Sequence, residues 1–258
     1  KKGCNLILIG RNEEKGENVV EQIRKIAENY VDIDYFTADL MLMKEVSRVA
    51  DEVSRKYPKI DILLNNVGAY FAFRDVTEEG FERTFALNHL GYFLMTKKLL
   101  PLIEKSGYAR IVNVSSSAHY GIDFEFDNIH GEKKYKGFDA YKKTKLANVM
   151  FTYELAKRIE SKGITANCLH PGFVATKFGN NNNILWRMFI GIAKMMMAIS
   201  VKDGAKTTVH LACSKDLENT TGRFFANCEV KKGSSKAKNE EHNQKLWEIS
   251  EKMLEPFL

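Results

Sequence analysis

The chain has 258 residues, of which 44% are hydrophobic and 28% are charged, and its formal net charge is +6 at pH 7. These proportions are ordinary for a globular protein and exclude a fibrous or disordered chain. The positive excess comes from scattered lysines and not from a concentrated basic stripe, so we predict no nucleic-acid surface.

In chain order, short β-rich runs alternate with longer segments of helical periodicity. The first half predicts a strand at residues 4–9, a helix at 11–30, a strand at 31–38, a helix carrying Val46, Val49 and Val53, a strand at 60–65 and a long helix at 77–104. The second half predicts a strand at 110–115, a helix at 140–161, a strand at 164–169, a helix at 202–213, a strand at 222–228 and a closing helix at 239–254.

This alternation predicts an α/β fold with a doubly wound parallel sheet, in which helices cover both faces in a three-layer, Rossmann-like α/β/α arrangement. No internal repeat and no linker divides the sequence. We therefore expect a single domain over residues 1–258.

The four cysteines are far apart and form no CxxC pair. This spacing favours reduced thiols in an intracellular protein over a disulfide framework or a metal site. The longest apolar stretch, residues 184–199, is interrupted by Arg187 and Lys194, so no membrane span is predicted.

Tyr141 and Lys145 stand four residues apart near the start of a predicted helix, on one of its faces. A free phenol titrates near pH ~10, and a neighbouring ammonium favours its ionised form. We therefore expect Lys145 to lower the pKa of Tyr141 and make it a general acid/base. Alone, such a pair is more often an unremarkable surface tyrosine and lysine.

Serines 115–117 end the strand that precedes this helix. Ligands of parallel α/β sheets bind beyond the carboxyl ends of the strands, so a serine there can meet Tyr141 and a substrate oxygen. Asn65, Asn66 and Gly68 follow the preceding strand in the same way, and Gly68 permits close passage of the chain. Asn88 is polar within an apolar helix, where it either serves a proton path or is a satisfied buried amide.

Together these motifs resemble the short-chain dehydrogenase/reductase family, in order and spacing, over essentially the whole chain. The stretches SSSAHY, KLANVMFTYELAKRI and LHPGFV are further similar to its retinol dehydrogenase-like branch. The resemblance implies that Tyr141 is the catalytic acid/base, Lys145 its pKa modifier and a ligand of the nicotinamide ribose, and Ser116 the substrate-orienting serine. It also implies that Asn88 belongs to a proton relay.

The resemblance implies a nucleotide cofactor as well. Its implied contacts, besides Tyr141 and Lys145, are Arg11, Asn12, Asp39, Leu40, Asn66, Gly68, Pro171, Gly172, Val174 and Thr176. Arg11 directly follows the first strand, where a cation suits a 2′-phosphate and an acidic residue would suit a free 2′-hydroxyl. We therefore favour NADP(H) over NAD(H), with no metal.

The family's first strand and its glycine-rich TGxxxGxG turn have no counterpart in this sequence, which resembles the family from the end of the first helix onward. That strand lies between those predicted at 4–9 and 60–65, so we expect a gap in the hydrogen-bond ladder. The turn also holds the cofactor pyrophosphate. We thus expect weak NADPH binding by this polypeptide alone. Either the sequence is an incomplete version of a normal enzyme or it is a shortened variant, and reading the coding sequence upstream of Lys1 distinguishes the two.

Residues 176–200 lie where the family places its substrate lid, and their tryptophan, phenylalanine and methionines suggest a lipophilic substrate such as a retinoid, steroid or isoprenoid. Core packing and, over 184–199, contact with a membrane surface are the alternatives. The resemblance also implies that a homodimer can form through the long helices, in an intracellular protein that is either cytoplasmic or membrane-associated.

We therefore expect an oxidoreductase that transfers a hydride between NADP(H) and a lipophilic alcohol or carbonyl. The alternative is a non-catalytic binding protein that keeps the fold but has lost its cofactor.

Overall fold

The computed structural model describes residues 3–27, 31–172 and 200–258. The strands are β1 (Leu6–Gly10), β2 (Ile33–Thr37), β3 (Ile62–Asn65), β4 (Ala109–Val114), β5 (Ile164–His170), β6 (Phe224–Ala226) and β7 (Glu229–Lys231). The helices are α1 (Glu13–Ala27), α2 (Met43–Lys56), α3 (Arg83–Phe85), α4 (Gly91–Glu104), α5 (Gly137–Arg158), α7 (Val201–Cys213) and α8 (Glu240–Leu254), with a π-helical segment η1 (Ala86–Leu90). Short 3₁₀ turns are η2 (Ser117–His119), η3 (Phe126–Asn128), η4 (Glu160–Lys162), η5 (Lys215–Leu217), η6 (Ser235–Lys238) and η7 (Glu255–Phe257).

The strands form two sheets within the described part of the chain. β1 pairs in parallel with β2, and a second sheet has the order β3-β4-β5-β6-β7, parallel except for the antiparallel β7. β1 and β3 are not paired with each other, so the ladder is interrupted where the sequence predicts a gap. All five residues of β1 are only partly buried, in contrast to the fully buried β4.

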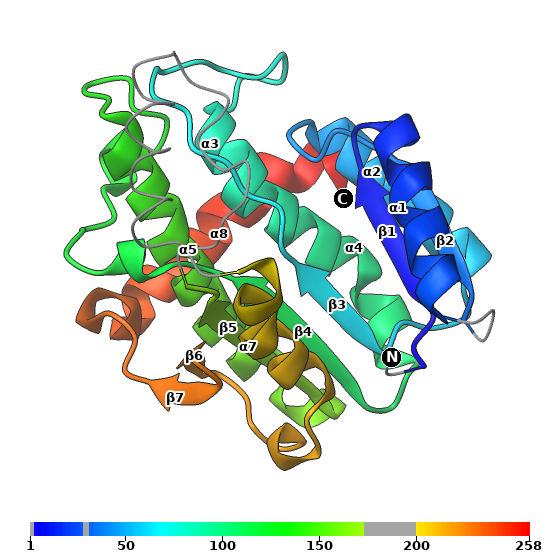
Figure 1. Ribbon diagram of the computed structural model, residues 1–258. Helices are drawn as coiled ribbons and strands as arrows, with labels where there is room; N and C mark the ends of the chain where they lie inside the picture. The colour runs from blue at the N-terminus through cyan, green and yellow to red at the C-terminus, as the bar shows by residue number, and fades with distance from the viewer. Residues whose placement is uncertain (1–2, 28–30, 173–199) are drawn as a thin grey trace.

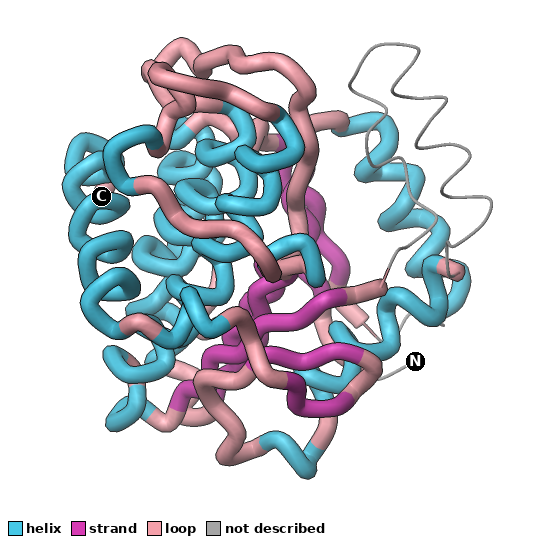
Figure 2. The backbone as a smooth tube through the Cα atoms, turned by 90° about the vertical axis from the view of Figure 1, so that its left-hand side faces the viewer, coloured by secondary structure: helices cyan, strands magenta, loops and turns pink. Residues whose placement is uncertain are grey.

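Helices cover both faces of the strands, which confirms the predicted three-layer fold (Figure 1). α4 and α5 pack on one face of the five-stranded sheet and α7 packs on the other, and the edge-on view in Figure 2 separates these layers. α8 packs outside α5 and adds a further helix on that side. The core between the layers is apolar and includes Phe93, Leu94, Leu146 and Met150, each at most 1% exposed.

Two predicted elements differ from the structure. The long helix predicted at 77–104 begins only at Arg83 and contains the π-helical turn η1, because Glu82 caps it by accepting hydrogen bonds from the backbone of Thr84 and Phe85. The run at 222–228 contains the short strand β6, after which Asn227 and Cys228 take positive φ values and turn the chain into the unpredicted strand β7.

Candidate functional site

Buried polar side chains form a hydrogen-bond network at the carboxyl ends of β3 and β4. The amide of Asn65 donates to Asn113 Oδ1 (2.8 Å) and to Thr96 on α4 (3.1 Å). Asn113 in turn donates to Thr152 on α5 at 3.0 Å. All four side chains are buried, so this network fixes both strands to α4 and to α5, the helix that carries Tyr141 and Lys145.

Tyr141 and Lys145 lie one turn apart on α5, and both are buried. Lys145 Nζ donates to the carbonyl oxygen of Val114 at 3.1 Å and lies 5.7 Å from the centre of the Tyr141 ring. The ammonium is therefore anchored at the end of β4 while it faces the phenol.

The three consecutive serines have different roles in the structure. Ser115 Oγ donates to the carbonyl oxygen of Lys145 at 2.7 Å, so its hydroxyl ties β4 to α5. Ser116 hydrogen-bonds the Tyr141 side chain and also caps η2 by accepting from the backbone of Ala118. Ser117 is exposed. Of the three serines, Ser116 therefore lies where a substrate oxygen beside Tyr141 can also accept a hydrogen bond from the Ser116 hydroxyl.

Asn88 is completely buried in η1 and uses its whole side-chain amide. Its Oδ1 accepts from Ala69 N at 2.8 Å, and its Nδ2 donates to Ala69 O at 2.9 Å and to Thr144 Oγ1 at 3.0 Å. Asn88 thus clamps the loop after β3 to the helix of Tyr141. Of the two interpretations of the sequence, the satisfied amide matches these bonds.

Gly68 lies against both groups: a Cβ there would stand 3.2 Å from Lys145 Nζ and 3.3 Å from Asn88 Oδ1. Gly68 and Asn66 are exposed, although their neighbours Asn65 and Ala69 are buried. The structure therefore brings together five of the residues predicted from the sequence, with the exposed Asn66 two residues before the first of them: Gly68, Asn88, Ser116, Tyr141 and Lys145.

The pKa of Tyr141 corrects one expectation. Burial raises the pKa of Tyr141 to about 12, and the hydrogen bond from Ser116 offsets this only in part. Burial also lowers the pKa of Lys145 to about 8. The sequence predicted a lowered pKa for Tyr141, but loss of hydration outweighs the charge at this distance. Tyr141 is consequently a protonated phenol at neutral pH, ready to donate.

The remaining predicted cofactor contacts lie at the ends of β1, β2 and β5. Arg11 is exposed after β1, and Asn12 Oδ1 caps the start of α1 by accepting from Lys15 N at 2.8 Å. Asp39 and Leu40 follow β2. Leu40 lies against Gly91 at the start of α4, where a Cβ would stand 2.9 Å from the Leu40 carbonyl oxygen.

Pro171 and Gly172 follow β5 at the same edge of the sheet. Val174 and Thr176, the lid predicted at 176–200 and the candidate membrane segment 184–199 lie outside the described residues, apart from Ser200, which caps α7.

His119 is a residue that the sequence reasoning missed. Its Nδ1 lies 2.5 Å from the carbonyl oxygen of Ser116, and its Nε2 lies 3.1 Å from the backbone nitrogen of Ser234. A carbonyl only accepts and an amide N–H only donates, so the ring is neutral with its proton on Nδ1. Burial lowers the pKa of His119 and favours this form. His119 therefore fixes the backbone of Ser116, a role that only a tertiary contact reveals.

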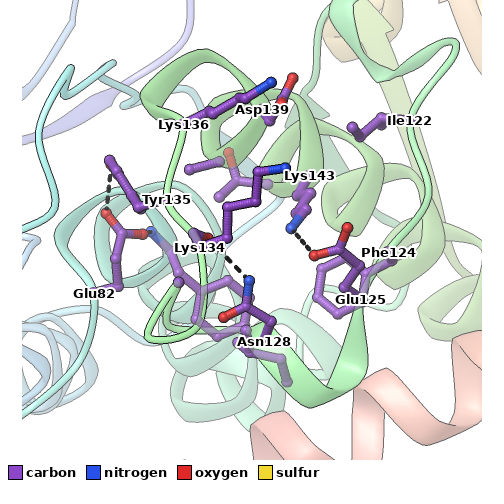
Figure 3. A pocket seen from close by; sticks show the side chains of 15 residues that line it. Glu82, Ile122, Phe124, Glu125, Asn128, Lys134, Tyr135, Lys136, Asp139 and Lys143 are labelled. Carbon is purple, nitrogen blue, oxygen red and sulfur yellow. Dashed lines mark hydrogen bonds and ion pairs between the residues drawn. The ribbon is translucent and has the colours of Figure 1, made fainter.

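A separate cavity of about 110 Å³ lies beside α5 (Figure 3). Ala140, Lys143 and Thr144 line it, whereas Tyr141 and Lys145 do not. Among its lining side chains, Glu82 Oε1 lies 3.1 Å from Tyr135 Oη, and Lys143 forms an ion pair with Glu125 at 2.6 Å. The cavity therefore lies apart from the face of α5 that carries the candidate catalytic residues.

A parallel sheet with a partly buried serine and a buried tyrosine and lysine at its carboxyl edge is the arrangement expected of a Rossmann-like oxidoreductase. The sequence model of short chain dehydrogenases matches residues 1–184, and the chain belongs to this family of oxidoreductases. It falls in the retinol dehydrogenase-like branch, as the sequence motifs predicted.

Two curated relatives illustrate this placement. Retinol dehydrogenase 14 of Mus musculus is 38% identical over 218 residues, which cover 84% of this chain and 65% of the relative. Retinol dehydrogenase 12 of Mus musculus is 35% identical over 257 residues, which cover 98% of this chain and 79% of the relative.

Solved structures share the fold. A protein from Mycobacterium paratuberculosis superposes with a TM-score of 0.73 at 26% identity, covering 96% of this chain and 83% of its own. A short chain dehydrogenase from Escherichia coli CFT073, solved in complex with NADPH, gives a TM-score of 0.62 at 22% identity over 86% of this chain and 85% of its own. At that identity the second likeness supports the fold alone.

The described residues lack two features, a membrane-spanning helix and a cluster of metal ligands. None of their helices is long and apolar enough to cross a membrane. Nor do they contain a cluster of three or more histidine, cysteine or acidic side chains suited to a metal ion.

Proposed function

We propose that this chain transfers a hydride between NADP(H) and a lipophilic alcohol or carbonyl compound, with Ser116, Tyr141 and Lys145 as its catalytic residues and Asn88 as a positioning residue that holds the loop after β3. The observation that carries the proposal is the placement of Tyr141: it is buried, bonded to Ser116 and faced by the ammonium of Lys145.

The residues present suit the two ends of such a cofactor. Gly68 is exposed and lies beside Lys145, where a nicotinamide ribose would be held, and Asn66 is exposed two residues earlier. The exposed guanidinium of Arg11 at the end of β1 suits a 2′-phosphate, which favours NADP(H) over NAD(H). The bound cofactor supplies the hydride that reaches the carbonyl carbon.

The protein's own groups handle the oxygen of the substrate. Ser116 and Tyr141 both present hydroxyls, so a carbonyl oxygen between them receives two hydrogen bonds that polarise it. Tyr141 then donates its proton to that oxygen, and the ammonium of Lys145 stabilises the phenolate that remains. Oxidation of an alcohol uses the same groups in reverse.

The lipophilic substrate class is supported by the relatives, which are named as retinol dehydrogenases. The apolar residues predicted as a lid agree with it. A membrane-surface contact through residues 184–199 and a homodimer also belong to the proposal. Because α8 packs on the outer side of α5, that side of α5 is covered and a dimer would use another face.

Replacing Tyr141 by phenylalanine tests the proposal. In the full-length protein, we expect Tyr141→Phe to reduce kcat about 10²- to 10⁴-fold for retinal with NADPH, because the general acid is lost. Tyr153→Phe is a matched control, since Tyr153 lies on the same helix about three turns away. The readout is NADPH consumption together with circular dichroism of both variants.

An unchanged rate in a folded Tyr141→Phe variant would refute the assignment. It would favour the alternative of a binding protein that keeps the fold without using this tyrosine.

A further inference from the structure

We propose that Tyr70 and Phe138 form an aromatic wall beside Tyr141 that selects substrates whose carbonyl is attached to a flat, unsaturated group. The inference rests on the proposed function and names which described residues determine its substrate class. Both residues lie in the described part of the chain.

The two rings enclose the phenol of Tyr141. Phe138 lies one helical turn before Tyr141, and its ring is nearly parallel to the phenol, with centroids 6.2 Å apart and planes at 22°. Tyr70 comes from the loop after β3 and meets the phenol edge-on, at 6.5 Å and 87°. The same Tyr70 ring also meets Phe138, at 6.3 Å and 69°, so the three rings form one cluster.

The exposure of these rings differs in a way that suggests where substrate lies. Tyr70 is 5% exposed and Tyr141 is 9% exposed, whereas Phe138 is 50% exposed. Leaving half of a phenylalanine in water forgoes much of the stabilisation that its burial would bring. An apolar group attached to a carbonyl at Tyr141 would cover this ring, because Phe138 is the exposed member of the cluster that contains the phenol.

The wall is held rigidly. A Cβ at Gly137 would stand 2.4 Å from the carbonyl oxygen of Phe71, so only glycine lets the loop approach α5 this closely. Tyr135 Oη donates to the same Phe71 oxygen at 3.0 Å. The Asn88 side chain hydrogen-bonds both the backbone N–H and the carbonyl oxygen of Ala69. Tyr70 therefore lies between two anchored residues, and the wall exists before substrate arrives.

A rigid aromatic wall discriminates by shape and by electron distribution. Flat, unsaturated groups stack on aromatic faces in offset or edge-to-face geometry and gain more than from area burial alone. A puckered, saturated group of the same length cannot approach both rings as closely. The expected discrimination for one such contact is about three- to tenfold.

Cinnamaldehyde and 3-cyclohexylpropanal test this inference, since they share one carbon skeleton and differ in flatness. We would measure kcat/KM for both aldehydes with NADPH in the full-length protein and its variants. The ratio of the two values is compared between variants, so the intrinsic reactivity of each aldehyde cancels. In Phe138→Leu and Tyr70→Leu, we expect the ratio of kcat/KM for cinnamaldehyde to kcat/KM for 3-cyclohexylpropanal to fall about three- to tenfold, mainly because KM for cinnamaldehyde rises.

Two further variants complete the design. Phe138→Tyr keeps a flat ring and should keep the wild-type ratio. Phe73→Leu removes a more exposed ring of the same loop, 69% exposed and outside the three-ring cluster, and should also leave the ratio unchanged.

The outcomes separate the two proposals. A wild-type enzyme that reduces both aldehydes, with the same ratio in Phe138→Leu, overturns the aromatic wall alone. An equal change in Phe73→Leu overturns it as well, because the effect would then not belong to the cluster. A wild-type protein that neither reduces these aldehydes nor oxidises their alcohols overturns the proposed function and the wall with it.

Discussion

The clamp made by Asn88 provides the sharpest test of how the site is built. In Asn88→Ala, the N–H and carbonyl groups of Ala69 lose their partner, and Thr144 Oγ1 loses a donor. Ala69 is 8% exposed, so water replaces these bonds poorly. Each buried polar group left without a partner costs about 1–3 kcal/mol, and two such backbone groups predict a loss of roughly 3 kcal/mol.

This loss is large enough to measure by thermal and urea unfolding followed by circular dichroism. For a chain of this size, roughly 3 kcal/mol corresponds to a Tm lower by about 6–12 °C. Catalysis should fall as well, because Ala69 connects Gly68 beside Lys145 to Tyr70 beside Tyr141.

Asn148→Ala is the matched control. Asn148 is also completely buried, but the hydrogen bond that its amide donates to Val114 O is 3.4 Å long. Lys145 donates to the same oxygen at 3.1 Å, so that oxygen keeps a partner in the control variant. A free energy of unfolding for Asn88→Ala within about 0.5 kcal/mol of wild type would refute the clamp, since that is the scale of surface substitutions.

Two predictions concern pH. Burial lowers the pKa of His89 from 6.5 to about 3, so the unfolded chain binds a proton that the folded chain refuses. His89 therefore costs no stability well above pH 6.5 but lowers the free energy of unfolding by about 2 kcal/mol at pH 5. In His89→Gln, the free energy of unfolding should lose this part of its dependence on pH. Parallel curves of the free energy of unfolding against pH for the two proteins would contradict the prediction. Burial also lowers the pKa of Lys145 to about 8, so kcat/KM for carbonyl reduction should fall about tenfold per pH unit above that value as the ammonium loses its proton. Lys145→Arg should retain activity at higher pH than wild type, because a guanidinium keeps its charge. Lys142→Met, a control at a neighbouring lysine, should keep the wild-type dependence of kcat/KM on pH. A wild-type kcat/KM that stays level up to about pH 9.5 would exclude the role of the ammonium.

Local patterns in the sequence determined the elements and the identity of the candidate catalytic residues. β-rich runs and helical periodicities are properties of neighbouring residues, and they placed β1 to β6 and most of the helices to within a few positions, although the helix predicted from residue 77 begins at Arg83. The four-residue spacing of Tyr141 and Lys145 depends only on helix geometry, so it too was predictable. The carboxyl-end rule for parallel sheets then brought Gly68 and Ser116 to the same edge.

The tertiary structure decided how these residues are held and charged. The pKa of Tyr141 depends on burial, which is set by Tyr70, Phe138 and the surrounding elements, and burial reversed the direction expected from Lys145 alone. The choice of Ser116 among three identical neighbours follows from where each hydroxyl points after β4 ends.

Long-range contacts decided the rest. The bond of His119 to Ser234, the clamp of Asn88 on Ala69 and the approach of Phe71 to Gly137 join residues far apart in the sequence. The cost or gain of each contact depends on the desolvation and distance of both partners, and neither quantity exists until the chain has folded. The sequence by itself therefore determined which chemical groups are available, and only the fold decided their protonation and their partners.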